Sequence, residues 1–451
     1  MSPNAGFSDV SSAIEERAAV KLFWNNGTEL DQQAEQKIRS LLKGKLNVEH
    51  ALQVALLNNR DLQATYSELG IAQADLVQAG LLSNPVFDAA VLFPVAGGAS
   101  PDLELSLVMN FLDVLYMPLR KRVAAARFEE TKLRVTGAVL DFAAQVRTAF
   151  YTHQANEQML DLRQTIVQAL TASFEVARRL HEAGNITDLD YARERAQAES
   201  AKVTLRAAEV AARQSREALN TLMGLWGRET EWEVEGSMPD VPAEPLQTDN
   251  LESRALRSSV DIAHARQRII VAGEQLGFRR FTALIPEFHS GPLGEREGGE
   301  WEVGPTLEFP LPLFDRGRAR IGAAAAELRR AQQEYYATAV KIRSAARAAR
   351  DRMEGVRDRA LYYRDILLPL QERIVNEAQL QYNAMQLGPF QLLRAKEQQI
   401  ETAIAYIETL REYWLAQGDL RQIFSGRLPL SNGRPMGGSG GQMRMNDREG
   451  H

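Results

Sequence analysis

The sequence of 451 residues predicts a mainly α-helical fold with a small β part. Three observations support this prediction: a long heptad pattern, short stretches of alternating polarity, and landmarks that recur about 200 residues apart. We therefore expect a tandem duplication, in which each half contains a helix, a β-hairpin, a long helix and a return helix.

The longest predicted helix spans residues 317–382. Its apolar residues step by four and three, and this spacing keeps them on one side only if the helix coils left-handedly around its neighbours. At 1.5 Å per residue the helix measures about 100 Å, too long for a globular core. We expect Pro369 to bend it or weaken one turn without ending it. The apolar stripe comprises Tyr335, Ala339, Ile342, Ala346, Ala349, Met353, Val356, Ala360, Tyr363, Leu367, Leu370 and Ile374.

Two β-hairpins are predicted where the period changes from 3.6 to 2. Between Leu103 and Phe111 every odd position is apolar and most even positions are polar, and residues 86–95 provide the partner strand. In the second half we expect strands at 283–289 and 301–311, around a loop containing four glycines. Glu104 and Glu308 fall at matching places, where they either line a lumen or lie on a solvated face.

The remaining helices and the landmarks predict the domain boundaries. Helices are expected at 11–20, 30–42, 46–82, 119–180, 187–223, 250–280 and 390–424. We divide the chain into an N-terminal segment (1–45), a first repeat (46–224, hairpin 85–112), a linker (225–249), a second repeat (250–426, hairpin 283–311) and a flexible tail (427–451). Trp226 and Trp232 are expected to anchor the linker by packing.

Composition excludes several classes of protein. The net charge of −6 and the lack of a dense basic run argue against nucleic-acid binding. The chain has no cysteine, which excludes disulfides and thiolate chemistry. The six histidines do not cluster, and we find no HExxH or phosphate-loop motif, so we expect no enzyme activity, cofactor or metal centre. Met436, Met443, Met445 and His451 are a minor candidate for copper(I), with an unstructured tail favoured.

The hairpins suggest a channel. A lone hairpin is marginal in water, but hairpins from several subunits joined edge to edge close into a barrel without free edges. Apolar-out, polar-in strands suit a membrane barrel with a wet lumen. No apolar run reaches the roughly 20 residues of a transmembrane helix. The N-terminus lacks signal-peptide features, which taken literally indicates the cytoplasm; we favour a processed or truncated form.

The duplicated layout resembles the TolC-like outer-membrane efflux protein family across residues 46–426. The segments that carry the resemblance are 46–52 (LNVEHAL), 59–62 (NRDL), 310–318 (PLPLFDRGR) and the two return turns. The resemblance implies a homotrimer in the outer membrane of a Gram-negative bacterium, with four strands per subunit in one lipid-embedded barrel and an α-barrel spanning the periplasm. It also implies a passive exit duct with two partners, a periplasmic adaptor and an inner-membrane efflux pump. The alternatives are a type I protein secretion component or, in a different class, a soluble coiled-coil scaffold.

The resemblance places the functional residues at the return turns. Adaptor docking is assigned by position to Gly184, Asn185, Ile186, Thr187, Leu387, Gly388, Pro389 and Phe390. The pore gate is assigned to Asp188, Asp190, Gln391 and Arg394. Where some relatives carry aspartates this chain has Gln391 and Arg394, so we expect Arg394 to repel cations and to pair with Asp188 or Asp190 in the closed state. An unchanged single-channel conductance in Arg394→Ala contradicts this latch. The sequence does not name the cargo.

Overall fold

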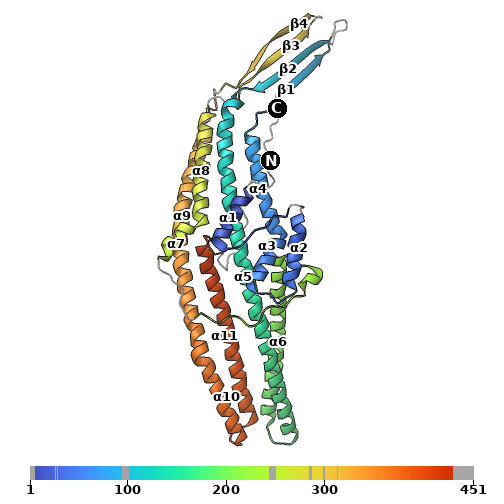
Figure 1. Ribbon diagram of the computed structural model, residues 1–451, viewed down its shortest axis with the longest axis vertical. Helices are drawn as coiled ribbons and strands as arrows, with labels where there is room; N and C mark the ends of the chain where they lie inside the picture. Colours follow the sequence, from blue (N-terminus) through green and yellow to red (C-terminus); the bar gives the residue numbers. More distant parts are fainter. Residues whose placement is uncertain are drawn as a thin grey trace.

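The computed structural model describes residues 6–25, 27, 29–93, 101–242, 250–283, 287–297, 300–311 and 313–429. It is an elongated molecule with a β-sheet at one end and two helical turns at the other (Figure 1). Met436, Met443, Met445 and His451 lie outside the described residues. The elements are α1 (Phe7–Ala18), α2 (Glu29–Leu42), α3 (Val48–Asn58), α4 (Arg60–Ala79), β1 (Val86–Leu92), β2 (Asp102–Asn110), α5 (Leu112–Glu182), α6 (Asp188–Met223), η1 (Gly227–Thr230), α7 (Leu251–Ser258), α8 (Val260–Phe281), β3 (His289–Glu297), β4 (Glu300–Glu308), α9 (Arg318–Tyr362), η2 (Tyr363–Leu367), α10 (Leu368–Asn383) and α11 (Pro389–Phe424).

The long helices confirm the prediction from the heptad pattern. Helix α5 has 71 residues, and α9, η2 and α10 form one helical path from Arg318 to Asn383. The π-helical turn η2 ends at Leu367, directly before α10, and Pro369 is the second residue of α10. Proline lacks the N–H that an α-helix needs, and a wider turn absorbs that defect. Pro369 therefore disturbs one turn without ending the helix, as predicted.

Two helices that we expected to be continuous are broken. The predicted helix 46–82 divides at Asn59, whose side chain accepts a 2.9 Å hydrogen bond from the backbone N–H of Leu62. The predicted helix 250–280 divides at Ser259, which accepts a 3.1 Å bond from Ile262 N–H. Both residues start a new helix because their side chains satisfy an N–H that the first turn leaves unpaired.

The four strands form one antiparallel sheet in the order β1-β2-β3-β4. Its register places Glu104 opposite Glu295, which lies opposite Glu302, and Glu308 opposite His289. Directly paired residues share a face, so one face is mostly polar and the other mostly apolar. The apolar face comprises Phe87, Ala89, Val91, Leu103, Leu105, Leu107, Met109, Trp301, Val303, Pro305 and Leu307, with Ser290, Pro292, Gly294 and Arg296 from β3.

The first strand of the second hairpin differs from the prediction. We expected it at 283–289 and a loop through Gly291 and Gly294, but β3 spans His289–Glu297 and contains both glycines. A Cβ atom at Gly291 would lie 1.7 Å from the carbonyl oxygen of Leu107 on β2. The glycine permits the close approach of two strands rather than marking a turn.

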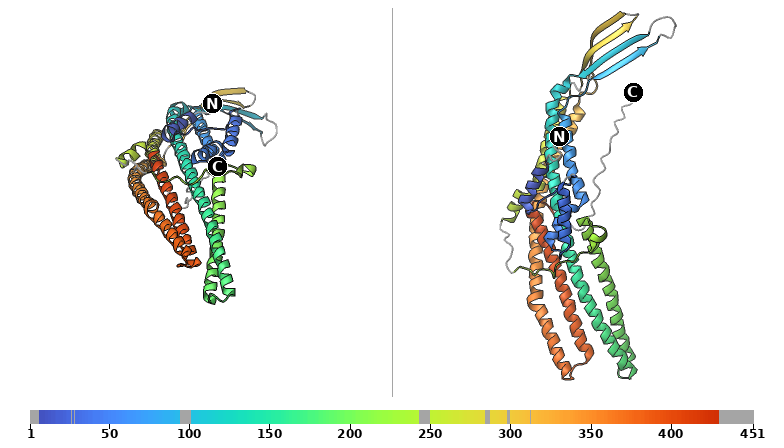
Figure 2. Two further views of the ribbon diagram at one scale, coloured as in Figure 1. Left: turned by 60° about the horizontal axis from the view of Figure 1, so that its bottom comes forward. Right: turned by 45° about the vertical axis from the view of Figure 1, so that its right-hand side comes forward.

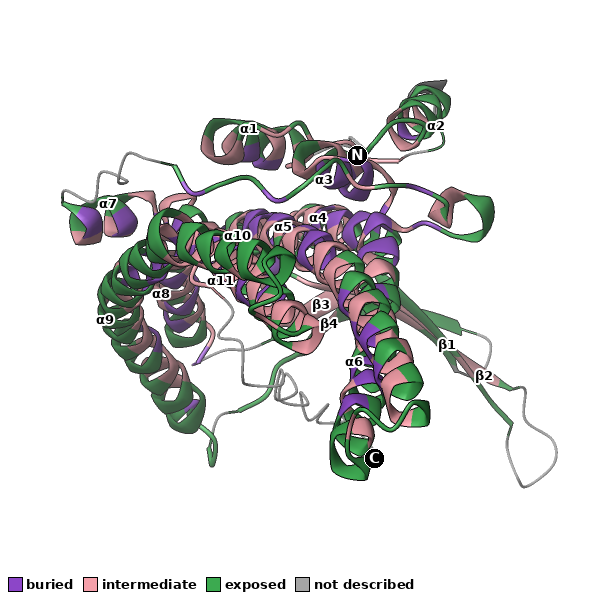
Figure 3. Cartoon of the chain, turned by 90° about the horizontal axis from the view of Figure 1, so that it is seen from below, coloured by how far each residue is buried: buried purple, intermediate pink, exposed green. Residues whose placement is uncertain are grey.

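The helices form a layer whose neighbours change along its length. Nearer the sheet, α4, α5, α8 and α9 lie side by side in that order, and nearer the tips α5 packs between α6 and α11. Helices α1, α2 and α3 lie together on one side of this layer (Figure 3). Along the molecule, α4 and α6 occupy successive levels beside α5 (right-hand view of Figure 2). Helices α8 and α11 likewise occupy successive levels beside α9.

The linker and the tail are partly anchored. Trp232 is buried and donates a 2.8 Å hydrogen bond to Asn220, whereas Trp226 is 81% exposed, so the predicted packing role is right for Trp232 and wrong for Trp226. The tail that we began at residue 427 starts with a bound residue: Arg427 contacts Asp141 and Asp261. A guanidinium between two partly buried carboxylates is held by charge-assisted hydrogen bonds, so Arg427 belongs to the packed part of the chain and not to the predicted flexible tail.

Candidate functional site at the helical tips

The first tip turn joins α5 to α6 and is held by its own side chains. Gly184 adopts φ +72°, a conformation that suits glycine after a helix, and Asn185 N–H reaches back to Leu180 O at 2.8 Å. Thr187 caps α6 by accepting a 3.1 Å hydrogen bond from Asp190 N–H. Its hydroxyl also donates to the Asp190 carboxylate at 2.7 Å. Gly184, Asn185 and Thr187 are exposed and Ile186 is half-buried.

The first turn contains a residue that was not predicted from the sequence. His181 Nε2 lies 2.6 Å from Asp188 Oδ1, and the His181 ring stacks on Tyr191 with centroids 4.7 Å apart. The signal in the sequence was a histidine and an aspartate seven residues apart across the glycine turn. Asp188 is therefore engaged inside its own hairpin.

The second tip turn joins α10 to α11 and has fewer contacts of this kind. Gly388 N–H donates a 3.1 Å bond to the side-chain oxygen of Gln391, and Pro389 starts α11, where a missing N–H costs nothing. Met385 adopts φ +56° and is 95% exposed. Leu387 and Phe390 are half-buried. Gln391, assigned to the gate, thus caps its own helix.

The predicted latch has a different partner within the chain. Arg394 Nη2 lies 3.6 Å from Glu194 Oε1, not against Asp188 or Asp190. Glu194 is buried and also accepts a 2.7 Å hydrogen bond from Ser173 Oγ. Asp188 and Asp190 are used by His181 and Thr187 instead. The pairing of Arg394 with either aspartate is therefore wrong in the single chain.

A small apolar cluster supports the Arg394–Glu194 pair. It joins the two tip hairpins through side chains of α5, α6 and α11, namely Ile166, Leu170, Ala198, Ala201, Ile400 and Ile404. Arg163 of α5 and Glu401 of α11 form a second ion pair beside it. Partial burial, together with the negative charge of Glu401, raises the pKa of Glu397. The two hairpins are thus connected by apolar packing and by two ion pairs.

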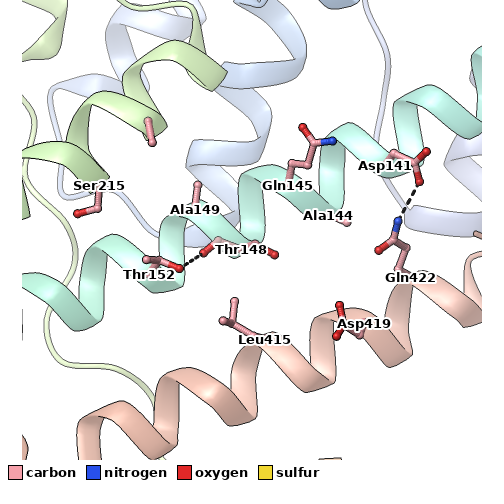
Figure 4. Close-up of a pocket in the computed structure, with 11 residues that line it drawn as sticks. Asp141, Ala144, Gln145, Thr148, Ala149, Thr152, Ser215, Leu415, Asp419 and Gln422 are labelled. Atoms are coloured by element: carbon pink, nitrogen blue, oxygen red, sulfur yellow. Dashed lines mark hydrogen bonds between the residues drawn. The ribbon is translucent and has the colours of Figure 1, made fainter. Parts of the chain in front are cut away.

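A cavity of about 280 Å³ lies farther from the tips, between α5, α6 and α11 (Figure 4). Asp141 accepts a 2.9 Å hydrogen bond from Gln422 there, and Asp419 lies 3.3 Å from Arg352. Burial raises the pKa of Asp419. The lining is otherwise alanine, threonine, glutamine, serine and leucine, and its Ser215 Oγ lies 3.0 Å from Nδ1 of the buried His153.

The described part of the chain contains neither a cluster of potential metal ligands nor a helix able to span a membrane. No group of three or more His, Asp or Glu side chains among its residues could hold a metal ion. Likewise, none of its helices combines the length and apolarity needed to cross a bilayer.

Comparison with known proteins gives consistent matches. Residues 119–225 match the family described as outer membrane efflux protein. The cobalt-zinc-cadmium resistance protein CzcC of Cupriavidus metallidurans is 22% identical over 385 residues, 84% of this chain and 90% of CzcC. The toluene efflux pump outer membrane protein TtgC of Pseudomonas putida is 24% identical over 60% of each chain.

Solved structures share the fold. The CmeC outer membrane channel of Campylobacter jejuni aligns with a TM-score of 0.68 and 14% identity, covering 91% of this chain and 90% of CmeC. The outer membrane protein VceC of Vibrio cholerae aligns with a TM-score of 0.66 and 16% identity, covering 84% and 96%.

Proposed function

We propose that this chain, a member of the TolC-like outer-membrane efflux protein family, forms the outer-membrane exit duct of a tripartite efflux system in a Gram-negative bacterium. Three copies enclose one passage, with their sheets joined in a barrel and their helices in a tube that crosses the periplasm. A duct of this kind conducts substrates without bond chemistry.

The observation that carries this proposal is the register of the sheet. It gathers the apolar side chains of β1, β2 and β4 on one face, and Val303 is 77% exposed there. Opposite them, Glu104, Glu295 and Glu302 lie in one row on the polar face. Lipid covers the first face and water fills the space behind the second. A cytosolic scaffold has no use for such a face, which disfavours that alternative.

The helices provide the length for a periplasmic tube. Helix α5 has 71 residues and therefore measures about 105 Å. This exceeds the hydrocarbon core of a bilayer, about 30 Å, more than threefold. With the sheet in the membrane, the tip turns lie far from it, where an adaptor linked to an inner-membrane pump can reach them.

The names of the relatives favour efflux over type I protein secretion, because they describe efflux pumps and metal resistance. They name different cargoes, cobalt-zinc-cadmium and toluene. Similar ducts thus serve different cargoes, which fits a system in which the pump, and not the duct, selects the cargo.

The lipid-facing side of the sheet can be tested by a matched pair of substitutions. Val303→Lys places a charge on the apolar face and should cost about 2–4 kcal/mol in the membrane. Thr306→Lys places it on the polar face and should leave insertion nearly unchanged. For each variant, the yield of detergent-resistant trimers and the channel conductance in planar bilayers measure how well it inserts. A monodisperse monomer in detergent-free buffer contradicts the proposal.

We also propose that the tip residues 184–187 and 387–390 dock the adaptor. Crosslinkers at Asn185 and Gln386, both exposed at the turns, should capture a co-expressed adaptor. A crosslinker at the exposed Trp226, away from both tips, is the control. Equal capture from all three positions contradicts tip docking.

The gate is proposed to include the Arg394–Glu194 pair, with Asp188, Asp190 and Gln391 shaping the two turns beside it. Breaking the pair removes an ion pair between the hairpins, so Arg394→Ala and Glu194→Gln should both raise single-channel conductance. Arg195→Ala removes a neighbouring exposed charge and should not. Conductance equal to that of the unmodified channel in both test variants contradicts this gate.

A further inference from the structure

A groove with many arginines crosses four neighbouring helices near the sheet. It has a volume of about 1310 Å³ and is lined by residues of α4, α5, α8 and α9. Its five arginines are Arg120, Arg127, Arg134, Arg279 and Arg320, against three carboxylates, Asp75, Glu130 and Glu327. The tip turns and the sheet do not contribute to it.

The groove lies on the side of the helix layer opposite α1. Helix α1 contacts α5 through Lys132, whose Nζ lies 2.9 Å from Asp9, while the groove uses other positions of α5. Arg120, Arg127 and Arg134 follow at seven-residue intervals and thus share one face of α5, about 10 Å apart. The groove therefore spans four adjacent helices on the face of their layer that is turned away from α1. This side faces the interior of the duct, an assignment that rests on the proposed function.

The charges of the groove are unequally neutralised. Arg120, Arg134 and Arg320 each contact a carboxylate outside the lining: Asp113 at 3.0 Å, Glu68 at 2.8 Å and Asp315 at 3.4 Å. Two of the acids are likewise engaged by bases outside it: Glu130 lies 3.5 Å from His264, and Glu327 lies 3.6 Å from Arg330. Arg127 and Arg279 have no carboxylate within 4.0 Å in the described part of the chain. Both side chains are exposed to the groove.

A second observation concerns hydrogen bonding. The Nε atom of Arg120 is buried and has no acceptor among the described residues. A buried N–H without an acceptor is unfavourable. This Nε is not exposed to the groove, and both Nη atoms of Arg120 already donate, to Asp113 and to Leu81 O. An oxyanion in the groove therefore meets the two unpaired guanidinium groups of Arg127 and Arg279, and arginine matches the planar geometry of phosphate and carboxylate oxygens.

We propose that this groove is an anion-binding site in the inner wall of the duct, which holds a small multivalent oxyanion of the phosphate type. Arg127 and Arg279 provide its principal charge. In a trimer, three such sites form a basic belt below the acidic row Glu104, Glu295 and Glu302 of the sheet. The duct wall therefore attracts cations at one level and anions at another, and multivalent anions pause at the lower one.

The test is equilibrium binding of pyrophosphate to the purified full-length trimer in detergent. Low ionic strength, about 10 mM, keeps the Debye length near 30 Å, so exposed arginines act with little screening. We expect saturable binding, with the Kd raised about tenfold in the Arg127→Ala/Arg279→Ala double variant. Arg266→Ala/Arg343→Ala removes the same charge from exposed positions of α8 and α9 outside the groove and should leave the Kd unchanged.

Three results overturn the proposal: no saturable binding, a Kd that the double variant does not change, or equal weakening by the control pair. Circular dichroism and size-exclusion chromatography establish that each variant is a folded trimer. Single-channel conductance of the same preparation separates this proposal from the function of the duct. Conductance without pyrophosphate binding refutes the groove alone, and binding without conductance refutes the duct alone.

Discussion

The two tip hairpins have the same design but differ in how they are stabilised. In the first, both helices bury apolar residues in the cluster shared with α11, namely Ile166 and Leu170 of α5 and Ala198 and Ala201 of α6, and His181 contacts Asp188 across the turn. In the second, α10 has no buried residue among those described, and Leu370 and Ile374 are about half exposed. Both helices of the first hairpin are thus anchored in this cluster, whereas in the second hairpin α11 is anchored and α10 presents its apolar stripe outward. Helix α10 is therefore the least anchored of the four tip helices in the single chain, which makes the second hairpin the better candidate for movement.

Truncating one leucine in each hairpin should give the largest difference in stability. Leu170→Ala removes a buried side chain and should lower the free energy of unfolding by about 2–5 kcal/mol. Leu370→Ala removes a half-exposed one and should cost less than about 1 kcal/mol in the single chain. Urea unfolding of the two variants measures the difference. Equal costs in the isolated chain contradict the distinction between the hairpins.

Acid should weaken the first hairpin in particular. His153 of α5 is buried with its Nδ1 3.0 Å from Ser215 Oγ of α6, and burial together with Arg216 lowers its pKa to about 4. The unfolded chain takes up a proton near pH 6.5 that the folded chain resists. Stability from the neutral ring is thus present above pH 6.5 and is lost as the pH falls to 4, about 3 kcal/mol in all.

The His153→Gln variant isolates this contribution. Its side chain cannot be protonated, so its free energy of unfolding should fall less between pH 7 and pH 4 than that of the unmodified protein. Thermal unfolding at successive pH values gives both curves. Parallel curves show that His153 does not govern the acid sensitivity of this hairpin.

Replacing the glycine of each turn should give a smaller difference in stability between the hairpins. Gly184 has φ +72°, so Gly184→Ala should cost about 1–2 kcal/mol of backbone strain. Gly388 has φ −75° and ψ 158°, which any residue adopts, so Gly388→Ala should cost only the difference between glycine and alanine at a helix N-cap, about 0.5 kcal/mol. Differential scanning calorimetry compares them. A larger loss at Gly388 shows that its turn is more constrained than its backbone angles indicate.

Local features were predicted well because they depend on neighbours in sequence. Glycine and proline predict the return turns and the effect of Pro369. The two-residue period of polarity predicts the strands β1, β2 and β4. The breaks at Asn59 and Ser259 were missed, although each residue is a good helix cap followed two positions later by aspartate. Hydrophobic periodicity continues through both positions, so it predicts one unbroken helix where the capping residue starts a second one.

Long-range features could not be predicted in the same way. Gly291 looked like a loop residue because only the β2 backbone, far away in sequence, shows why a strand needs a glycine there. Arg394 was assigned carboxylates near the first turn, but the packing of α6 against α5 buries Glu194 among several exposed acids and selects it as the partner. Nothing in the stretch around Glu194 distinguishes it from Glu199.

The sequence by itself determined the lengths of the helices, the positions of their turns and the alternation that gives the sheet one apolar face. These depend on backbone geometry and on periods that are visible in any one segment. Only the tertiary structure decided which carboxylate meets Arg394, which arginines of the groove lie without a partner, and which half of the apolar stripe is covered. Those outcomes depend on how separate helices align, because burial and ion pairing are properties of contacts between segments that the sequence does not place side by side.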